Sequence, residues 1–213
     1  MPKVIRVLVV DDSALIRNIL TRGLSQDPGI EVVGAAHDPY QARDMIVQHD
    51  PDVMTLDVEM PRMDGVEFLR RLMPQYPVRV VMVSSLTEKG KQITLDALDA
   101  GAIDFVTKPT SDVSAGMEEL LTLLRTKIKI ASTAKVSHWK GRKPSRQVAA
   151  PVSERALSET TDKVIAIGAS TGGTEAIRKV ITAFPPSAPG VVIVQHMPPG
   201  FTQMFSERMN TLA

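Results

Sequence analysis

Acidic residues follow two short apolar segments of this sequence. The run Val7–Val10 leads directly into Asp11 and Asp12, and the run Val53–Leu56 ends on Asp57. Short apolar runs of this kind are typical of buried parallel strands, and the carboxyl ends of such strands meet at one edge of a sheet. Carboxylates brought together there repel one another unless a cation lies among them, and Mg²⁺ prefers oxygen ligands. The pattern therefore predicts a magnesium site.

Two more polar residues follow apolar segments further along the chain. Ser84 ends the run 78–84, and Lys108 follows the run 103–107. Asp57 could attack phosphorus as a carboxylate nucleophile, Ser84 could donate a hydrogen bond to a phosphoryl oxygen, and Lys108 could supply a balancing positive charge. One acid at a strand end is usually a helix cap or a solvated loop residue. Polar residues of complementary chemistry at successive strand ends favour a phosphate acceptor at Asp57.

Strands and helices alternate through the first half of the chain. The segments expected as strands are 4–10, 30–36, 52–56, 78–83 and 103–107. The segments expected as helices are 14–24, 39–48, 66–73, 88–100 and 113–130. Strict alternation with apolar strands predicts a parallel α/β sheet covered by helices on both faces.

This pattern resembles the receiver domain of bacterial response regulators. The resemblance lies in Asp11-Asp12, in Asp57 within the segment 56–65, in Ser84, and in Lys108-Pro109. It covers about residues 1–127 and implies a doubly wound, five-stranded sheet in the flavodoxin-like order. It also implies that a histidine kinase phosphorylates Asp57 with Mg²⁺ bound.

The resemblance assigns further roles residue by residue. Asp12, Asp57 and the backbone carbonyl of Glu59 would bind the metal directly, with Asp11 close by. Ser84 would be the hydroxyl that contacts the phosphoryl group, with Ser85 as a neighbouring alternative, and Lys108 would contact the phosphate.

The composition changes between the two halves. Residues 128–160 are expected to be a flexible linker, because the basic, Pro-, Ser- and Ala-rich part of this segment buries too little apolar area to offset the entropy of ordering. A basic cluster of this kind could bind an acidic partner or RNA, although it is more often simply solvated. The only tryptophan, Trp139, lies within it and could anchor a protein contact.

A glycine-rich turn lies between a strand and a helix in the second half. Residues 163–167 and 190–194 are expected as strands, the first leading into the turn 168–173 and the second ending at Gln195-His196. The turn lacks the lysine of a P-loop and is not GxGxxG, which disfavours phosphate binding. Its glycines could serve tight helix packing. Alternatively, Gly-x-Ser-x-Gly around Ser170 matches a nucleophile elbow, with His196 placed as a general base.

Taken as a whole, the chain resembles the chemotaxis methylesterase (CheB) family. The matching segments are 168–173 and 194–202, which follow a receiver domain and a linker. The resemblance implies that residues 161–213 begin a second parallel α/β domain, a hydrolase. It implies hydrolysis of glutamyl methyl esters, and deamidation of glutamines, on methyl-accepting chemoreceptors. Ser170 would attack the carbonyl carbon, His196 would transfer the proton, and no cofactor would be needed.

One family residue has no counterpart here. The triad aspartate of the family lies far downstream of the histidine, and neither Asp162, Glu175 nor Glu207 matches its motif. Two hypotheses therefore stand: a phosphorylation-regulated esterase that needs a further C-terminal part, and a phosphoacceptor signalling module without esterase activity. Two strands cannot bury both faces of a parallel sheet, so residues 161–213 alone are expected to be poorly ordered, aggregation-prone or dependent on a partner.

Composition narrows the class of protein. The chain has 213 residues, is 43% hydrophobic, has no cysteine, and carries a formal net charge of +1. Disulfides and thiol catalysis are excluded, and the balanced charge gives no general basis for binding nucleic acid or membranes. The N-terminus does not resemble a signal peptide, and no long apolar run predicts a membrane span. We expect a cytoplasmic protein.

Overall fold

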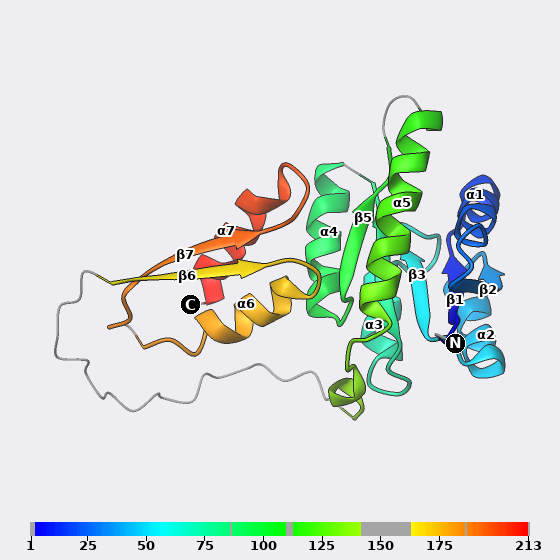
Figure 1. Cartoon of the computed structure of the whole chain (residues 1–213). Helices are drawn as coiled ribbons and strands as arrows, with labels where there is room; N and C mark the ends of the chain where they lie inside the picture. The colour runs from blue at the N-terminus through cyan, green and yellow to red at the C-terminus, as the bar shows by residue number, and fades with distance from the viewer. Residues whose placement is uncertain (1–2, 86, 110–112, 142–162, 186, 213) are drawn as a thin grey trace. The chain divides into compact units, whose positions relative to one another are not determined.

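The computed structural model describes residues 3–85, 87–109, 113–141, 163–185 and 187–212. The chain divides into two compact units, Met1–Lys143 and Pro144–Ala213, which are described separately. Figure 1 labels their helices and strands.

A five-stranded parallel sheet forms the centre of the first unit. The strands are β1 (Ile5–Val10), β2 (Ile30–Ala36), β3 (Val53–Asp57), β4 (Arg79–Ser84) and β5 (Asp104–Thr107). Their order across the sheet is β2-β1-β3-β4-β5, and every neighbouring pair is parallel. The predicted doubly wound fold is therefore confirmed. The order in which successive strands are added to the sheet reverses between β1 and β3. Ligands of such folds bind at the carboxyl ends of the strands on either side of this reversal.

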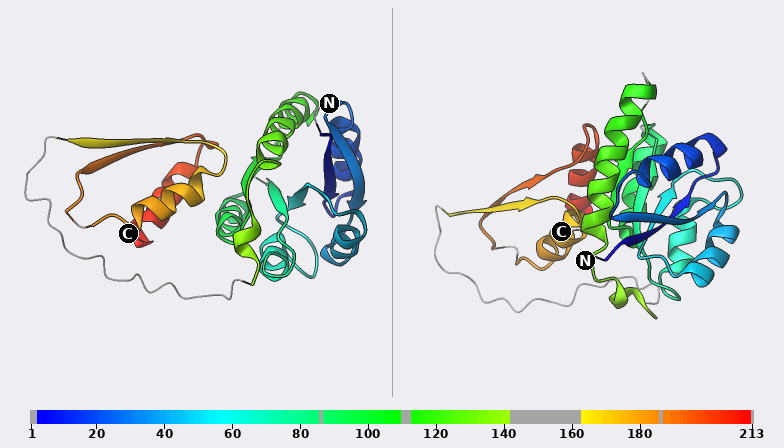
Figure 2. Two further views of the ribbon diagram at one scale, coloured as in Figure 1. Left: turned by 60° about the horizontal axis from the view of Figure 1, so that its bottom comes forward. Right: turned by 45° about the vertical axis from the view of Figure 1, so that its right-hand side comes forward.

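Five helices cover the two faces of this sheet. They are α1 (Ala14–Leu24), α2 (Pro39–His49), α3 (Gly65–Leu72), α4 (Glu88–Asp99) and α5 (Val113–Ala131). Helices α1 and α5 lie on one face and the other three on the opposite face (Figure 2). The side chains that cap the first four helices are Ser13, Asp38, Asp64 and Thr87. Each accepts a hydrogen bond from a backbone N–H that the helix itself leaves unpaired.

The main hydrophobic core lies between the sheet and the pair α1 and α5. Leu20 and Leu24 of α1 meet Leu124 and Ile128 of α5 there, over the apolar side chains of β1, β3 and β4. Because both ends of α5 contribute to this contact region, the helix continues past residue 127 to Ala131.

Part of the segment predicted as a linker is attached to the first unit. A short 3₁₀ helix, η1 (Ser137–Trp139), follows α5. The indole of Trp139 lies against Gly101, where an added β-carbon would come within 3.0 Å of the ring. The N–H of Gly141 donates to the carbonyl oxygen of Pro74 at 2.8 Å. The structure therefore places Trp139 in contact with the first unit. The rest of the predicted linker, residues 142–160, lies outside the described residues.

The described residues of the second unit form two parallel strands and two helices. These are β6 (Val164–Ala169), α6 (Gly173–Ile181), β7 (Gly190–Gln195) and α7 (Phe201–Leu212). Both helices lie on the same side of the strand pair in the left view of Figure 2. Alternate residues of both strands are exposed, and Val192 and Val194 are 56% and 68% exposed. Within the described residues of this unit, one face of the small sheet is therefore uncovered, and marginal stability of residues 161–213 alone stays a prediction. In the described part of the chain, no helix is long and apolar enough to cross a membrane.

Removing Leu124 should show that α5 stabilises the first unit. Leu124 is fully buried, so Leu124→Ala should lower the free energy of unfolding by about 2–5 kcal/mol. Its neighbour Leu123 is 36% exposed, and Leu123→Ala should cost no more than about 0.5 kcal/mol. Chemical denaturation of both variants measures the difference, and equal losses would contradict the packing described here.

Candidate functional site

The polar residues singled out in the first half of the sequence meet at one edge of the sheet. Asp57 ends β3 and Ser84 ends β4, whereas Asp11 and Lys108 follow directly after β1 and β5. The strand register aligns these ends, because Val10 pairs with Leu56, Asp57 with Val83, and Ser84 with Thr107. The backbone N–H of Lys108 also donates to the carbonyl oxygen of Ser84 at 2.7 Å.

Lys108 forms ion pairs with two buried carboxylates. Its Nζ lies 2.9 Å from Asp11 Oδ2 and 2.8 Å from Asp57 Oδ2. Burial raises the pKa of Asp57 to about 6; the Asp11 charge adds to this rise, whereas Lys108 opposes it. Burial acts to lower the pKa of Lys108, but the Asp57 and Asp11 carboxylates outweigh it and raise that pKa. The cluster therefore holds more negative charge than one ammonium group balances.

The same carboxylates are arranged to suit a divalent cation. Asp11, Asp12 and Asp57 each place one oxygen within 4.8 Å of the others. Oδ1 of Asp11 accepts a hydrogen bond from the Ser13 N–H at 2.9 Å. Its buried Oδ2 accepts none, although it lies at ion-pair distance from Lys108. A buried carboxylate oxygen that pairs with Lys108 and accepts no other hydrogen bond, together with an exposed Asp12, fits a hard cation such as Mg²⁺.

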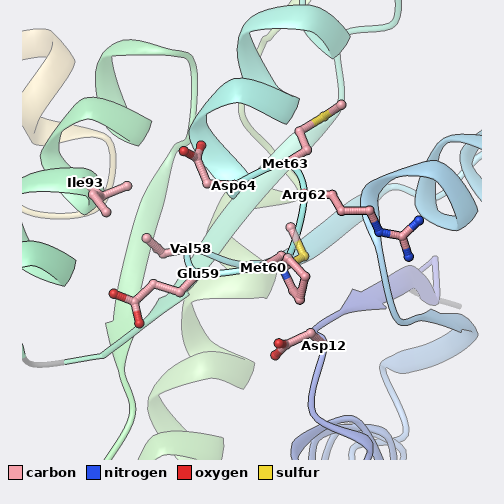
Figure 3. A pocket seen from close by; sticks show the side chains of 9 residues that line it. Asp12, Val58, Glu59, Met60, Arg62, Met63, Asp64 and Ile93 are labelled. Carbon is pink, nitrogen blue, oxygen red and sulfur yellow. The ribbon is translucent and has the colours of Figure 1, made fainter.

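An open pocket of about 610 Å³ lies beside this cluster (Figure 3). Its lining residues are Asp12, Val58, Glu59, Met60, Pro61, Arg62, Met63, Asp64 and Ile93. The loop that forms it is closed by a 2.9 Å hydrogen bond from the Gly65 N–H to the Val58 carbonyl oxygen. A β-carbon at Gly65 would overlap the backbone oxygen of Asp57, so only glycine fits there. The loop therefore holds the backbone next to Asp57 in a fixed position.

The hydroxyl of Ser84 is directed toward α4. Ser84 is fully buried, and its Oγ lies 2.5 Å from Oγ1 of Thr94, which is also fully buried. Ser85 is partly exposed, and its Oγ lies 3.2 Å from Thr87 Oγ1. Nothing in the sequence marked Thr94, since one threonine within a helix has no pattern of its own.

Ser170 and His196 are neighbours at the carboxyl ends of the second pair of strands. Ala169 pairs with Gln195, and the His196 N–H donates to the Ala169 carbonyl oxygen at 3.1 Å. Both Ser170 and His196 are exposed. The glycine turn is needed for this geometry, because Gly172 has a φ of 74° where α6 begins.

Gln195 connects these two residues, and the sequence reasoning missed this role. Its Nε2 donates to the backbone carbonyl oxygens of both Ser170 and His196, each at 3.0 Å. A β-carbon at Gly173 would overlap the Gln195 side chain, so this glycine makes room for the amide. The available signal was the position of Gln195 directly before the predicted base.

Two acids of the second unit are occupied elsewhere. Glu175 forms an ion pair with Arg178 at 2.8 Å, and Glu207 accepts a hydrogen bond from Gln203 at 3.0 Å. These partners agree with leaving the triad acid unassigned. Asp162 lies outside the described residues.

Comparisons with known proteins match both units. The family model "Response regulator receiver domain" matches residues 7–124, and the model "CheB methylesterase" matches residues 165–213. A protein-glutamate methylesterase/protein-glutamine glutaminase of Syntrophotalea carbinolica is 69% identical over 215 residues, covering 100% of this chain and 60% of that protein. A second such protein, from Syntrophus aciditrophicus, is 53% identical, covering 98% of this chain and 60% of its own length.

A solved structure supports the same relationship for the first unit. The response regulator domain of Thermotoga maritima CheB is 44% identical, with a TM-score of 0.57 over 62% of this chain and 99% of that one. The chain thus spans about 60% of the length of the curated relatives it matches.

Replacing Lys108 should change both stability and metal affinity. Lys108→Met removes the ammonium from two buried carboxylates, and losing one partner of a buried pair costs about 3–5 kcal/mol; partial exposure of Lys108 favours the lower end. The variant should bind Mg²⁺ more tightly, because no ammonium then competes for the carboxylates. Unfolding with and without Mg²⁺ measures both effects.

Lys129→Met is the matched control for that variant. Lys129 is half-exposed and pairs with Asp27, so its loss should cost only about 0.2–1 kcal/mol and leave Mg²⁺ affinity unchanged. Equal Mg²⁺ affinity in Lys108→Met and the parent protein would show that Lys108 and the metal do not share the carboxylates.

Proposed function

This chain belongs to the CheB family of response regulators, and we propose that its first unit is switched by phosphorylation of Asp57. The observation that carries the proposal is the Lys108–Asp57 ion pair inside the acidic cluster. A buried carboxylate kept beside a cation and two further acids is unexpected in a merely structural core.

This geometry supports phosphoryl transfer to Asp57. A carboxylate oxygen of Asp57 attacks phosphorus as the bond to the donor breaks, and the electron pair of that bond leaves with the donor. The new acyl phosphate carries more negative charge, which Lys108 balances and to which Ser84 donates a hydrogen bond. We assign the donor role to a histidine kinase.

The residues that would hold Mg²⁺ are those of the acidic cluster. We propose Asp12, Asp57 and the backbone carbonyl of Glu59 as ligands, with Asp11 next to them. The ion would supply positive charge to the phosphoryl oxygens. Glu59 is exposed, and its side chain would not be required.

The second unit is the output that this switch would regulate. We propose that Ser170 attacks the carbonyl carbon of a glutamyl methyl ester and that His196 takes the hydroxyl proton and returns it to the departing methanol. N–H groups of the glycine turn are candidate donors to the oxyanion. The substrates would be methyl-accepting chemoreceptors, met in the cytoplasm, and deamidation of their glutamines would use the same residues.

A phosphoacceptor module without esterase activity is the second candidate. It is favoured by the uncovered face of the β6–β7 pair and by the engagement of Glu175 and Glu207 with other side chains. An orienting acid is worth about 10⁴-fold in rate in other enzymes with a Ser-His-Asp triad. The protein would then act through its first unit alone.

Labelling with acetyl phosphate tests the phosphoacceptor. The parent protein should incorporate phosphate in the presence of Mg²⁺, and Asp57→Asn should abolish incorporation because the nucleophilic carboxylate is gone. Glu59→Gln is the control and should retain labelling and Mg²⁺ binding, since only the backbone carbonyl of this residue is assigned a role. Persistent labelling of Asp57→Asn would mean that the acceptor is misassigned.

Methanol release from methylated receptor membranes distinguishes the two functions. If the chain is an esterase, Ser170→Ala should lose at least about 10³-fold in rate, because the nucleophile is removed. Ser187→Ala, which changes an exposed serine between α6 and β7, should leave the rate unchanged. Equal release by the parent and Ser170→Ala would exclude the esterase function for this chain.

A further inference from the structure

The Ser84 hydroxyl is enclosed by hydrogen-bond acceptors that belong to α4 and the turn before it. Thr94 Oγ1 lies 2.5 Å from Ser84 Oγ, the Ser85 carbonyl oxygen 3.2 Å, and the Gly90 carbonyl oxygen 3.4 Å. Ser84 and Thr94 are both fully buried, so water does not compete for these bonds. The hydroxyl is therefore directed toward α4.

Relative distances favour one direction for the hydrogen bond between the two hydroxyls. Thr94 Oγ1 lies 2.6 Å from the Gly90 carbonyl oxygen, which can only accept, so Thr94 donates its single proton there. Thr94 Oγ1 is then an acceptor toward Ser84, and we assign Ser84 as the donor because its other acceptors, at 3.2 and 3.4 Å, are more distant. The one proton of Ser84 is thus committed to Thr94.

A glycine allows α4 to approach Ser84 this closely. A β-carbon at Gly90 would lie 2.5 Å from Ser85 Oγ and 2.7 Å from the Ser85 carbonyl oxygen. Because real β-carbons do not come so close, a larger residue would push the first turn of α4 away from the end of β4. The short contact between Ser84 and Thr94 therefore depends on glycine at this position.

We propose that Thr94 is a positioning residue: it holds the Ser84 hydroxyl directed toward α4 and thereby opposes phosphorylation of Asp57. The inference rests on the proposed function, in which Ser84 donates to the phosphoryl group. One hydroxyl proton cannot serve Thr94 and the phosphoryl oxygen together, so the two acceptors compete. When Ser84 donates to a bound phosphoryl group, its hydrogen bond to Thr94 breaks, and β4 and α4 lose one hydrogen bond between them.

Thr94→Val removes the competing acceptor while keeping the volume of the side chain. The Gly90 carbonyl oxygen keeps its helical partner, because residue 94 lies one helical turn further along α4. Beryllium fluoride with Mg²⁺ is the probe, since it mimics a phosphoryl group on a carboxylate. We expect its dissociation constant to fall about three- to tenfold, the net effect of freeing one hydrogen bond. Calorimetric titration measures this change.

Three further variants separate positioning from a general loss of structure. Thr94→Ser keeps the acceptor and should behave as the parent protein does. Thr94→Val in a Ser84→Ala background should have no effect on the dissociation constant, because no hydroxyl proton remains to be released. Thr122→Val changes the same kind of helical threonine, which donates to the Glu118 carbonyl oxygen in α5, and should also have no effect.

The outcomes distinguish this inference from the function on which it rests. An unchanged or higher dissociation constant in Thr94→Val overturns the inference, as does a gain that persists in the Ser84→Ala background. If the parent protein itself fails to bind beryllium fluoride with Mg²⁺, the proposed phosphoacceptor is wrong and the inference falls with it.

Discussion

The arrangement of the first unit depends on the ion pairs that the ammonium group of Lys108 forms with Asp11 and Asp57. The ammonium group joins the end of β5 to carboxylates at the ends of β1 and β3, across the width of the sheet edge. Burying these acids would cost more without it, because burial and the Asp11 charge raise the pKa of Asp57 to about 6 even though Lys108 opposes the rise. The cluster is stable enough to fold and still lacks positive charge. That combination is what the proposed phosphorylation of Asp57 would require.

The sheet edge was predictable because its positions follow from chain periodicity. Apolar runs located the strands, parallel pairing aligned their ends, and residue type at those ends indicated the chemistry of Asp57 and Lys108. The contact between Ser84 and Thr94 was not predictable, because it depends on how closely α4 approaches β4. The same applies to Gln195, whose amide finds its two carbonyl partners only once the glycine turn has formed.

The boundary between the units shows a different limit of sequence reasoning. Residues 128–160 were expected to be a linker, although helical spacing had already indicated a helix as far as residue 130. Helix α5 ends at Ala131, and Trp139 lies against Gly101. Composition averages over a window, whereas attachment depends on one large side chain meeting one small one. The packing of the Trp139 indole on Gly101 attaches residues 137–139 to the first unit.

The position of Trp139 also determines what optical spectroscopy can see. The chain has one tryptophan and two tyrosines, and the tyrosines are Tyr40 and Tyr76. All three lie in the unit Met1–Lys143, so tryptophan and tyrosine absorbance and indole emission come entirely from that unit. The unit that carries Ser170 and His196 has no tryptophan or tyrosine and gives no indole or phenol signal. Indole emission would therefore report unfolding of the first unit without a contribution from the second. Far-ultraviolet circular dichroism would detect unfolding of the helices and strands of both units.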